Sequence, residues 1–442
     1  MRKSDTKNEA EIGRIIYVTR DIERALGISP SEDYVIVTNR TEYSESIKKQ
    51  FPESVILIDS KKEDLLDTDE LLEAPEMEKI MQGARRKTQG ASILVFKNNT
   101  LIESICKKNN WHLLNPSADL AEKIENKISA VEWLDGANNS DGLAKKYLPP
   151  HTVATTKDIK WQKEPLVIQW AHGHTGDGTI LVNSGDELKV LQTKFPDRLA
   201  RATSFVRGPS FTLNIVVTAE GIYTGNTSYQ ITGLPPFTDN PFSTIGNDWS
   251  LTHTLLSEKE INEIEYIARE IGQKMAKEGW CGMCGIDVMR DEERGRISLI
   301  EINARQPAST TLESFLQQEN RRAGVVGITI FEAYITALLG HRIEAPIIHI
   351  NDGAQIIKRL TKDSAPCALP SPGRFGESLA PNEIGDDVIG SLELAGYRVI
   401  RYPSTEYNSD QLRIQSMKGI MEAHAKFNSR GKEIADMLCQ RS

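Results

Sequence analysis

Apolar runs of strand length alternate with helical stretches over the first quarter of the chain. Residues 33–40 and 54–60 are short apolar runs that end in polar turns, residues 76–87 have the pattern of a helix, and residues 91–99 are a third apolar run. Strands that alternate with helices predict a parallel sheet. The first part of the chain is therefore expected to form an α/β unit.

A single amphipathic helix is expected over residues 115–136, with Ser117 placed to cap its N-terminus. Its apolar positions recur at helical spacing: Leu120, Ile124, Ile128 and Val131. Farther on, apolar strands at 165–170 and 180–183 flank a glycine-rich loop, and a helix is expected at 185–195.

The second half of the chain mixes strands and helices. Two strands flank a turn at Glu220–Gly221, and Ser257 with Glu260 predicts a capping box. The helix after this box has an apolar face made of Ile261, Ile264, Ala268, Ile271 and Met275. Strands are expected at 284–291 and 296–303, and a last region from about 346 to 442 has strands of its own and a final helix.

Composition bounds the class of protein. The chain has 442 residues, enough for about two to four domains. Its 53 Lys and Arg against 62 Asp and Glu leave a net charge of −9, so no nucleic-acid partner is expected. No apolar run approaches the roughly 20 residues of a membrane helix, and the N-terminal residues lack the apolar core of a signal peptide. A cytoplasmic protein without a membrane partner is expected.

The five cysteines are scattered and odd in number, which argues against a disulfide framework. Cys281 and Cys284 have the spacing of a redox or zinc half-site, but no second pair supplies the remaining zinc ligands. We expect both to be small buried residues at the start of a strand.

The strongest chemical signal lies where the strand at 296–303 ends. Glu301, Asn303 and Arg305 occupy alternate positions, so in an extended chain they share one face. Asp287 lies on the preceding strand. Two carboxylates and an amide offer hard oxygen ligands, and magnesium takes a few such ligands together with water and phosphate oxygens. Arg305 would then sit where a transferring phosphoryl group builds negative charge.

A second signal is the loop that follows Trp170. Gly173, Gly176 and Gly178 would let backbone N–H groups approach phosphate closely. The loop lacks the spacing of a P-loop and does not open a helix, so by itself it also fits an ordinary hairpin turn.

Simpler interpretations of these residues stay open. Asp287 could be a solvated strand end, and Glu301 with Arg305 a surface ion pair of little energetic value. His172 and His174 could be polar loop residues, since no third metal ligand accompanies them.

Together and in this order, the glycine-rich loop, "GIDVM" and "LIEINAR" resemble the ATP-grasp superfamily over roughly residues 30–345. The resemblance implies a mixed α/β fold with an N-terminal Rossmann-like domain at 1–116. It further implies a small lid domain with a glycine-rich hairpin at 117–206 and a larger mixed-sheet catalytic domain at 207–345. An additional C-terminal region at 346–442 completes the chain.

The resemblance also implies roles for individual residues. Asp287, Glu301 and Asn303 would bind magnesium (Mg2+), as two ions, with Mn2+ as an alternative, and Arg305 would be the catalytic contact to phosphate or the acyl intermediate. The residues implied to bind ATP are Lys127, Gln169, Gly173, His174, Gly176, Gly178, Thr179 and the adenine-reading hinge Ser204, Phe205 and Val206. Ser309 and Thr310 would belong to a pocket for the carboxylate substrate.

The chain departs from the family at Gln169, where a lysine is common. Glutamine can donate a hydrogen bond but cannot neutralise charge. Phosphate contacts would then depend on Lys127, the loop amides and the metal ions.

The resemblance implies an ADP-forming carboxylate–amine ligase that makes an acyl phosphate and then an amide or peptide bond. Its small-molecule partners would be an acid and an amine or peptide, in small-peptide or natural-product synthesis, and a homodimer is a habit of the family. Biotin-carboxylase-like carboxylation is disfavoured, because Ser309 stands where that enzyme has a glutamate. A non-catalytic ATP-binding module is the other alternative; Gln169 supports it and the intact acidic cluster opposes it.

Overall fold

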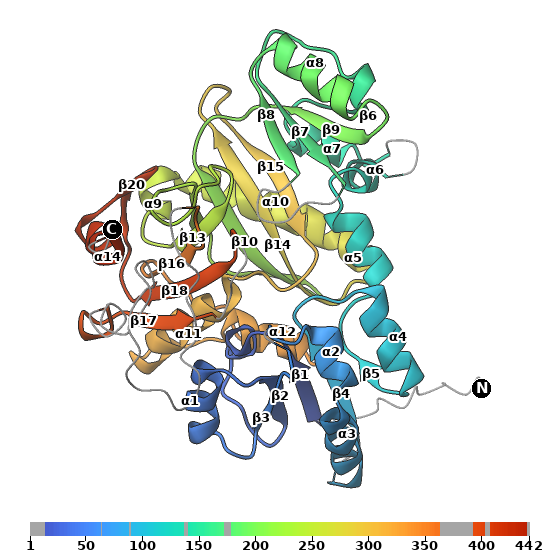
Figure 1. Cartoon of the computed structure of the whole chain (residues 1–442), viewed down its shortest axis with the longest axis vertical. Coiled ribbons are helices and arrows are strands. Elements are labelled where there is room, and N and C mark those ends of the chain that lie inside the picture. Colours follow the sequence, from blue (N-terminus) through green and yellow to red (C-terminus); the bar gives the residue numbers. More distant parts are fainter. Residues whose placement is uncertain are drawn as a thin grey trace.

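The computed structural model describes residues 14–62, 64–87, 90–136, 140–171, 178–362, 392–402 and 407–439, with the backbone alone at 84–87. Within these residues three larger sheets follow one another along the molecule (Figure 1). A parallel sheet lies at one end, a small antiparallel sheet at the other, and the largest sheet between them.

The parallel sheet confirms the α/β unit expected at the start of the chain. Its strand order is β3-β2-β1-β4-β5. The strands are β1 (Arg14–Val18), β2 (Tyr34–Asn39), β3 (Val55–Ile58), β4 (Ala91–Val95) and β5 (His112–Leu113). The helices between them are α1 (Glu42–Gln50), α2 (Thr68–Glu73), α3 (Pro75–Lys87) and α4 (Thr100–Lys108), with the short 3-10 helix η1 (Ile22–Ala25) after β1.

The small sheet has four antiparallel strands in the order β6-β9-β7-β8. They are β6 (His151–Thr155), β7 (Leu166–Trp170), β8 (Thr179–Val182) and β9 (Leu199–Ser204), and α8 (Gly185–Lys194) connects the last two. The hairpin of β7 and β8 is the one expected around the glycine-rich loop. Residues 172–177 of that loop, which include Gly173, His174 and Gly176, lie outside the described residues.

The largest sheet runs β15-β14-β10-β12-β13-β16-β18-β17, with β11 beside β10. Its strands are β10 (Ser210–Val217), β11 (Ile222–Thr224), β12 (Ser228–Thr232), β13 (Thr244–Asp248), β14 (Gly282–Asp291), β15 (Arg296–Asn303), β16 (Ala354–Arg359), β17 (Arg398–Arg401) and β18 (Asp410–Ser416). The strands of the C-terminal region therefore extend the same sheet through β16. The four domain ranges stay a prediction.

Helices cover this sheet and join it to the parallel one. The Ser257–Glu260 capping box is present at the start of α10 (Glu258–Lys277), which buries Ile264, Ala268 and Ile271 as expected. The remaining elements are α7 (Leu143–Tyr147), the 3-10 helix η3 (Thr156–Asp158), α9 (Thr252–Leu255), α11 (Thr310–Arg322), α12 (Ile330–Leu338), the hairpin β19 (Met421–Ala423) and β20 (Lys426–Phe427), and α14 (Ser429–Cys439). Phe331 and Tyr334 of α12 share a core with Tyr17 and Tyr34 of the parallel sheet.

The helix expected over 115–136 is two helices, α5 (Ala118–Glu125) and α6 (Ser129–Asp135). Ser117 caps α5 as predicted. The chain breaks at Asn126, whose Oδ1 accepts hydrogen bonds from the N–H groups of Ile128, at 3.0 Å, and Ser129, at 3.4 Å. A side chain that competes for backbone donors in this way favours a new helix start over a continuous helix. The break places Lys127 between the helices.

Two further expectations concern membranes and thiols. None of the described helices is long and apolar enough to cross a membrane. Cys284 is buried and Cys281 is half-buried, and neither is part of a disulfide. The expected burial is therefore confirmed for Cys284, whereas Cys281 is only partly buried.

Asn126→Ala should lower the free energy of unfolding by about 1 kcal/mol, because the α6 donors lose their side-chain acceptor. Asn126→Asp keeps an acceptor oxygen and is the matched control, so it should stay close to the wild type. Urea denaturation of the three chains measures the difference. Equal losses in both variants would show that the break does not depend on this acceptor.

Candidate functional site

Two acidic side chains face each other across the edge strands of the largest sheet. Asp287 on β14 is the direct antiparallel neighbour of Glu301 on β15. Like charges directly opposite each other destabilise a sheet unless cations balance them. Cations from three other segments of the chain surround this pair.

A β-bulge decides which way Glu301 points. The register shifts between Asp287 and Val288, so Ile300 has no partner on β14. Before the bulge, Ile297 and Leu299 face the core, and after it Ile302 and Ala304 do. Without the extra residue, Glu301 would be on the core side with Leu299. The bulge therefore turns the polar positions of the strand out of the core.

Asp287 is held by two donors. Thr212 Oγ1 donates to Asp287 Oδ1 at 2.7 Å, and Asn303 Nδ2 donates to Oδ2 at 3.0 Å. Burial, and next the charge of Glu301, raise the pKa of Asp287 to about 6. The positive charge near Asp287 is therefore too small to offset burial and the charge of Glu301.

Glu301 has the opposite balance. Lys127 Nζ lies 2.5 Å from Glu301 Oε1, and the lysine is buried. Burial alone would raise the pKa of Glu301, but Lys127, Arg305 and Arg201 together lower it. The break between α5 and α6 is what brings Lys127 to the carboxylate.

Arg305 is oriented by a glutamate that the sequence did not single out. Its Nη2 donates to Asn303 Oδ1 at 3.0 Å, and its Nε donates to Glu125 Oε1 at 3.1 Å. Lys97 lies 3.0 Å from the other oxygen of Glu125. Glu125 ends α5, directly before the helix break.

Arg201 is the most consequential residue that sequence reasoning missed. It lies on β9 beside Gln169 of β7, and its Nη2 donates to Gln169 Oε1 at 2.6 Å and to the Ile300 carbonyl at 3.1 Å. That carbonyl belongs to the bulged residue. Burial lowers the pKa of Arg201 to about 10, against the effect of Glu301, so the guanidinium stays charged at neutral pH.

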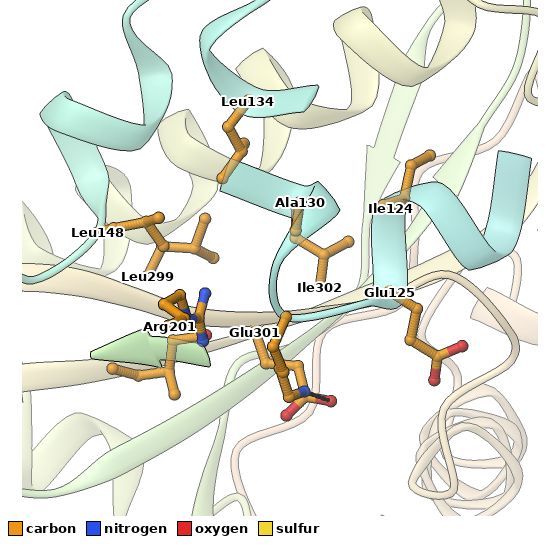
Figure 2. Close-up of a pocket in the computed structure, with 11 residues that line it drawn as sticks. Ile124, Glu125, Ala130, Leu134, Leu148, Arg201, Leu299, Glu301 and Ile302 are labelled. Atoms are coloured by element: carbon orange, nitrogen blue, oxygen red, sulfur yellow. Dashed lines mark hydrogen bonds and ion pairs between the residues drawn. The ribbon is translucent and has the colours of Figure 1, made fainter. Parts of the chain in front are cut away.

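Lys127 and Arg201 line a pocket with about 240 Å³ of empty space, part of it open to solvent. Figure 2 shows apolar side chains, among them Leu134, Leu148 and Leu299, to one side of Arg201 and Glu301. Lys127 and Glu125 also belong to the lining. The pocket is therefore lined by apolar side chains and by charged side chains.

The other residues predicted to bind the nucleotide lie on the small sheet and its hinge. Thr179 starts β8 and lies 3.4 Å from Gln169 Nε2, and Gly178 before it has a φ of +80°. In the hinge, the N–H groups of Ser204 and Phe205 donate to the carbonyls of Pro150 and Pro165. Of the three hinge residues, Val206 alone has an N–H without such a backbone bond in the described part of the chain.

The predicted substrate residues have internal partners. Ser309 Oγ donates to Asn214 Oδ1 at 3.2 Å, and Thr310 Oγ1 donates to the Pro307 carbonyl at 2.8 Å. Both side chains are buried. Their hydroxyls hold the start of α11 in this structure, and a contact with substrate stays a prediction.

The donor set suits a magnesium ion that shares its coordination with phosphate. Among the described residues no group of three or more His, Cys, Asp or Glu is placed to hold a metal by itself. Asp287 and Glu301 are adjacent acids with the amide of Asn303 beside them, which fits an ion that takes few protein ligands. The raised pKa of Asp287 shows that the place favours added positive charge.

Comparison with solved structures identifies the fold. An N5-carboxyaminoimidazole synthetase from Staphylococcus aureus, complexed with ADP, has a TM-score of 0.61 at 11% identity, over 99% of this chain and 100% of that one. An L-amino acid ligase from Bacillus licheniformis has a TM-score of 0.58 at 13% identity, over 98% of each chain. A biotin carboxylase from Campylobacter jejuni has a TM-score of 0.58 at 16% identity, over 93% of this chain and 89% of that one.

These likenesses confirm the predicted α/β architecture and show that the chain has the ATP-grasp fold. No protein-family model and no curated protein sequence matches the chain. At such low identity the comparisons establish the fold and leave the reaction to be argued from the site.

Asp287→Asn should stabilise the metal-free chain at about pH 8 by about 1–2 kcal/mol. The folded pKa of Asp287 is raised to about 6, so the wild type loses stability as pH rises toward and through that value. The asparagine has no charge to bury, and the two chains should converge at about pH 4. Chemical denaturation at both pH values measures the difference. A gain that does not depend on pH would contradict the assignment.

Proposed function

We propose that the chain is an ATP-dependent ligase that activates a carboxylate as an acyl phosphate and joins it to an amine, with release of ADP and phosphate. One observation carries the proposal: two facing carboxylates, Asp287 and Glu301, are surrounded by Lys127, Arg201 and Arg305 on an ATP-grasp fold. Cations and acids at such short range suit a reaction that needs positioning and charge neutralisation more than covalent catalysis.

The nucleotide would lie between the small sheet and β15. Lys127 and Arg201 line the pocket there and can donate to phosphate oxygens as charged donors. Arg201 takes over the charge that Gln169 lacks, and Gln169 orients it through the bond to Oε1. The hinge Ser204, Phe205 and Val206 would read adenine through the remaining N–H of Val206, and Gly178 and Thr179 would border the phosphates.

Asp287, Glu301 and Asn303 would hold magnesium. When bound, the ion would supply positive charge against the negative charge that builds up during phosphoryl transfer. In the structure Lys127 occupies the cationic position beside Glu301. The lysine is therefore expected to turn from Glu301 toward the phosphates when the nucleotide enters.

The chemistry then needs no side-chain nucleophile. A carboxylate oxygen of the acid attacks the γ-phosphorus, the bond to ADP breaks, and an acyl phosphate forms. The amine nitrogen attacks the acyl carbon, phosphate leaves, and the amine loses a proton. Arg305, fixed by Glu125 and Asn303, would contact the transferring phosphoryl group.

Two alternatives are kept apart by experiment. Bicarbonate as the activated acid would make the reaction a carboxylation, and product formation would then depend on bicarbonate. A non-catalytic ATP-binding module would bind ADP without releasing phosphate from ATP. Support for catalysis comes from the half-buried pair of facing acids, which is unfavourable in a sheet and is of little use to a mere binding module.

The proposal is tested by trapping the acyl phosphate. Full-length protein, ATP and Mg2+ are incubated with individual acids and hydroxylamine, which converts an acyl phosphate to a coloured hydroxamate. At least one acid should give hydroxamate together with stoichiometric ADP. ADP release that needs bicarbonate and gives no hydroxamate would favour carboxylation, and no release with any acid would favour the binding module.

Glu301→Gln should abolish hydroxamate formation, a loss of at least about a hundredfold, because the amide cannot neutralise the metal ion. Glu260→Gln is the matched control, since it breaks an ion pair with Arg290 of the same sheet away from the site. The control should keep full activity. A Glu301→Gln chain with wild-type turnover would remove Glu301 from the metal site.

Arg201→Gln should weaken ADP binding about tenfold or more, the effect of one lost charge-assisted hydrogen bond. Gln169→Lys alone should lower the melting temperature, since it places two cations side by side on neighbouring strands. The double variant Gln169→Lys/Arg201→Gln keeps one cation and should recover much of the affinity. Calorimetric titration with ADP and Mg2+ measures the affinity of each chain, and no recovery in the double variant would mean that Arg201 does not act as the missing lysine.

A further inference from the structure

A chain of charged side chains, three of them buried and two partly exposed, runs from the parallel sheet into the largest sheet. It alternates three guanidinium groups with two carboxylates, in the order Arg24, Glu23, Arg413, Asp410 and Arg359. Glu23 and Arg24 belong to η1, and the other three come from β16 and β18 (Figure 1). We name these five residues the ion chain.

Each contact within the ion chain is longer than a hydrogen bond. The nitrogen–oxygen distances are 3.4 Å from Arg24 to Glu23, 3.8 Å from Glu23 to Arg413, 3.9 Å from Arg413 to Asp410 and 3.6 Å from Asp410 to Arg359. Good hydrogen bonds of this kind are about 2.7–3.2 Å long. The groups are thus near enough to attract one another but are not satisfied by one another.

Several polar atoms of the ion chain have no hydrogen-bond partner in the part of the chain that the structure describes. They are Arg24 Nη1, Glu23 Oε1, Arg413 Nε and Nη2, and Arg359 Nε. The hydroxyl of Tyr402, whose ring lies beside Arg413, is in the same state. The side chain of Arg413 is only 1% exposed and that of Glu23 only 3%. Arg359 and Arg413 do donate through their other nitrogens, to Ser243, Thr244 and Ala308. Buried polar atoms that remain without a hydrogen bond are costly, so the arrangement favours a ligand that supplies acceptors.

The charges of the ion chain do not balance. Three guanidinium groups against two carboxylates leave one positive charge in excess. Asp21, the next carboxylate along, has its pKa raised to about 7 by burial first and by Glu23 next, so at neutral pH it supplies only part of a charge. Arg20 beside it is paired with Asp67 at the surface. A ligand with a single negative charge would complete the balance.

The position of the ion chain matches a substrate site. The order of the parallel sheet reverses direction between β1 and β4, and ligands of such sheets bind at the carboxyl ends of the strands beside this point. η1 follows β1, and Phe96 follows β4. The centroid of the Phe96 ring lies 4.7 Å from the Arg24 guanidinium carbon and 5.8 Å from that of Arg305.

The loop that leaves β15 also connects the two places. Gln306 Nε2 donates to the Arg24 carbonyl at 2.8 Å, and the Ala308 carbonyl lies 3.4 Å from Arg413 Nη1. The loop starts at the acidic pair and ends at the ion chain.

We propose that Arg413 and Arg24 bind a carboxylate of a substrate other than the carboxylate that is activated. This inference rests on the proposed ligase function and adds the substrate class: at least one substrate is an amino acid or a dicarboxylic acid. A phosphate monoester would also be an anion, but it carries about −1.5 to −2 charges at neutral pH, more than the ion chain lacks. Glu23 and Asp410 would repel the surplus.

Thermal melting of the full chain without nucleotide tests the proposal. The probes are individual L-amino acids, succinate and glutarate, with L-amino acid amides as neutral controls and ribose 5-phosphate as the phosphate monoester. At least one carboxylate should raise the melting temperature, and its amide should not. The assignment would be overturned if ribose 5-phosphate raised the melting temperature and no carboxylate did. It would also be overturned if none of the probes raised the melting temperature.

Arg413→Gln leaves two cations against two acids, so the ion chain becomes neutral and the variant should fold while binding the carboxylate about tenfold or more weakly. Arg321→Gln is the matched control, because it removes a half-buried arginine paired with Glu332 on the neighbouring helix. The control should respond like the wild type. An Arg413→Gln chain that responds equally well to the carboxylate would contradict the proposal.

Asp410→Asn gives a result of opposite sign if Arg413→Gln does not fold. It raises the excess to two positive charges, so the carboxylate should stabilise this variant more than the wild type, and an equal or smaller effect would count against the site. ADP binding and hydroxamate formation are measured in parallel. Normal ADP binding and hydroxamate formation, with no carboxylate whose binding depends on Arg413, would refute this inference alone. Carboxylate binding without ADP binding or hydroxamate formation would refute the ligase.

Discussion

The structure depends on the meeting of two carboxylates, Asp287 and Glu301, on facing positions of β14 and β15. Such a pair is unfavourable in a sheet, and the chain tolerates it only because cations arrive from elsewhere. Lys127 comes from the break between α5 and α6, Arg305 from the end of β15, and Arg201 from the small sheet. The helix break, the end of β15 and the small sheet thus each place a cation near the acidic pair.

The small sheet takes part in this arrangement through one unpaired carbonyl. The bulge frees Ile300 from the ladder, and Arg201 donates to its carbonyl while Gln169 Oε1 holds the same guanidinium. Arg201 thus places a positive charge beside Gln169 on the adjacent strand, and the glutamine is its acceptor.

The same strand leads to the second buried cluster. Beyond Arg305 the chain passes Gln306, which bonds to the backbone of Arg24, and Ala308, which lies against Arg413. The unbalanced ion chain and the acidic pair thus lie at the two ends of one short loop. In the proposed reaction the acidic pair would bind the cation that accompanies the nucleotide, and the ion chain would bind the anionic substrate.

Much of this could be read from the sequence, because local rules govern it. Alternating apolar runs predicted the parallel sheet, Ser257 and Glu260 predicted the start of α10, and the alternate spacing of Glu301, Asn303 and Arg305 predicted a shared face. The bulge left a trace as well: Ile297 and Leu299 are apolar at odd positions, and Glu301 and Asn303 are polar at odd positions. A regular strand cannot satisfy both sets.

Tertiary structure alone decided the rest, since it concerns partners far apart along the chain. Neither the hydrogen bonds that Asn126 Oδ1 accepts at the helix break nor the pairing of Arg201 with Gln169 across two strands follows from spacing. Glu23 and Arg413 are joined only because η1 of the parallel sheet packs against β18 of the largest one. Residue types along a chain set which charges exist, but the free energy of burying them depends on which opposite charges the fold brings within a few ångströms.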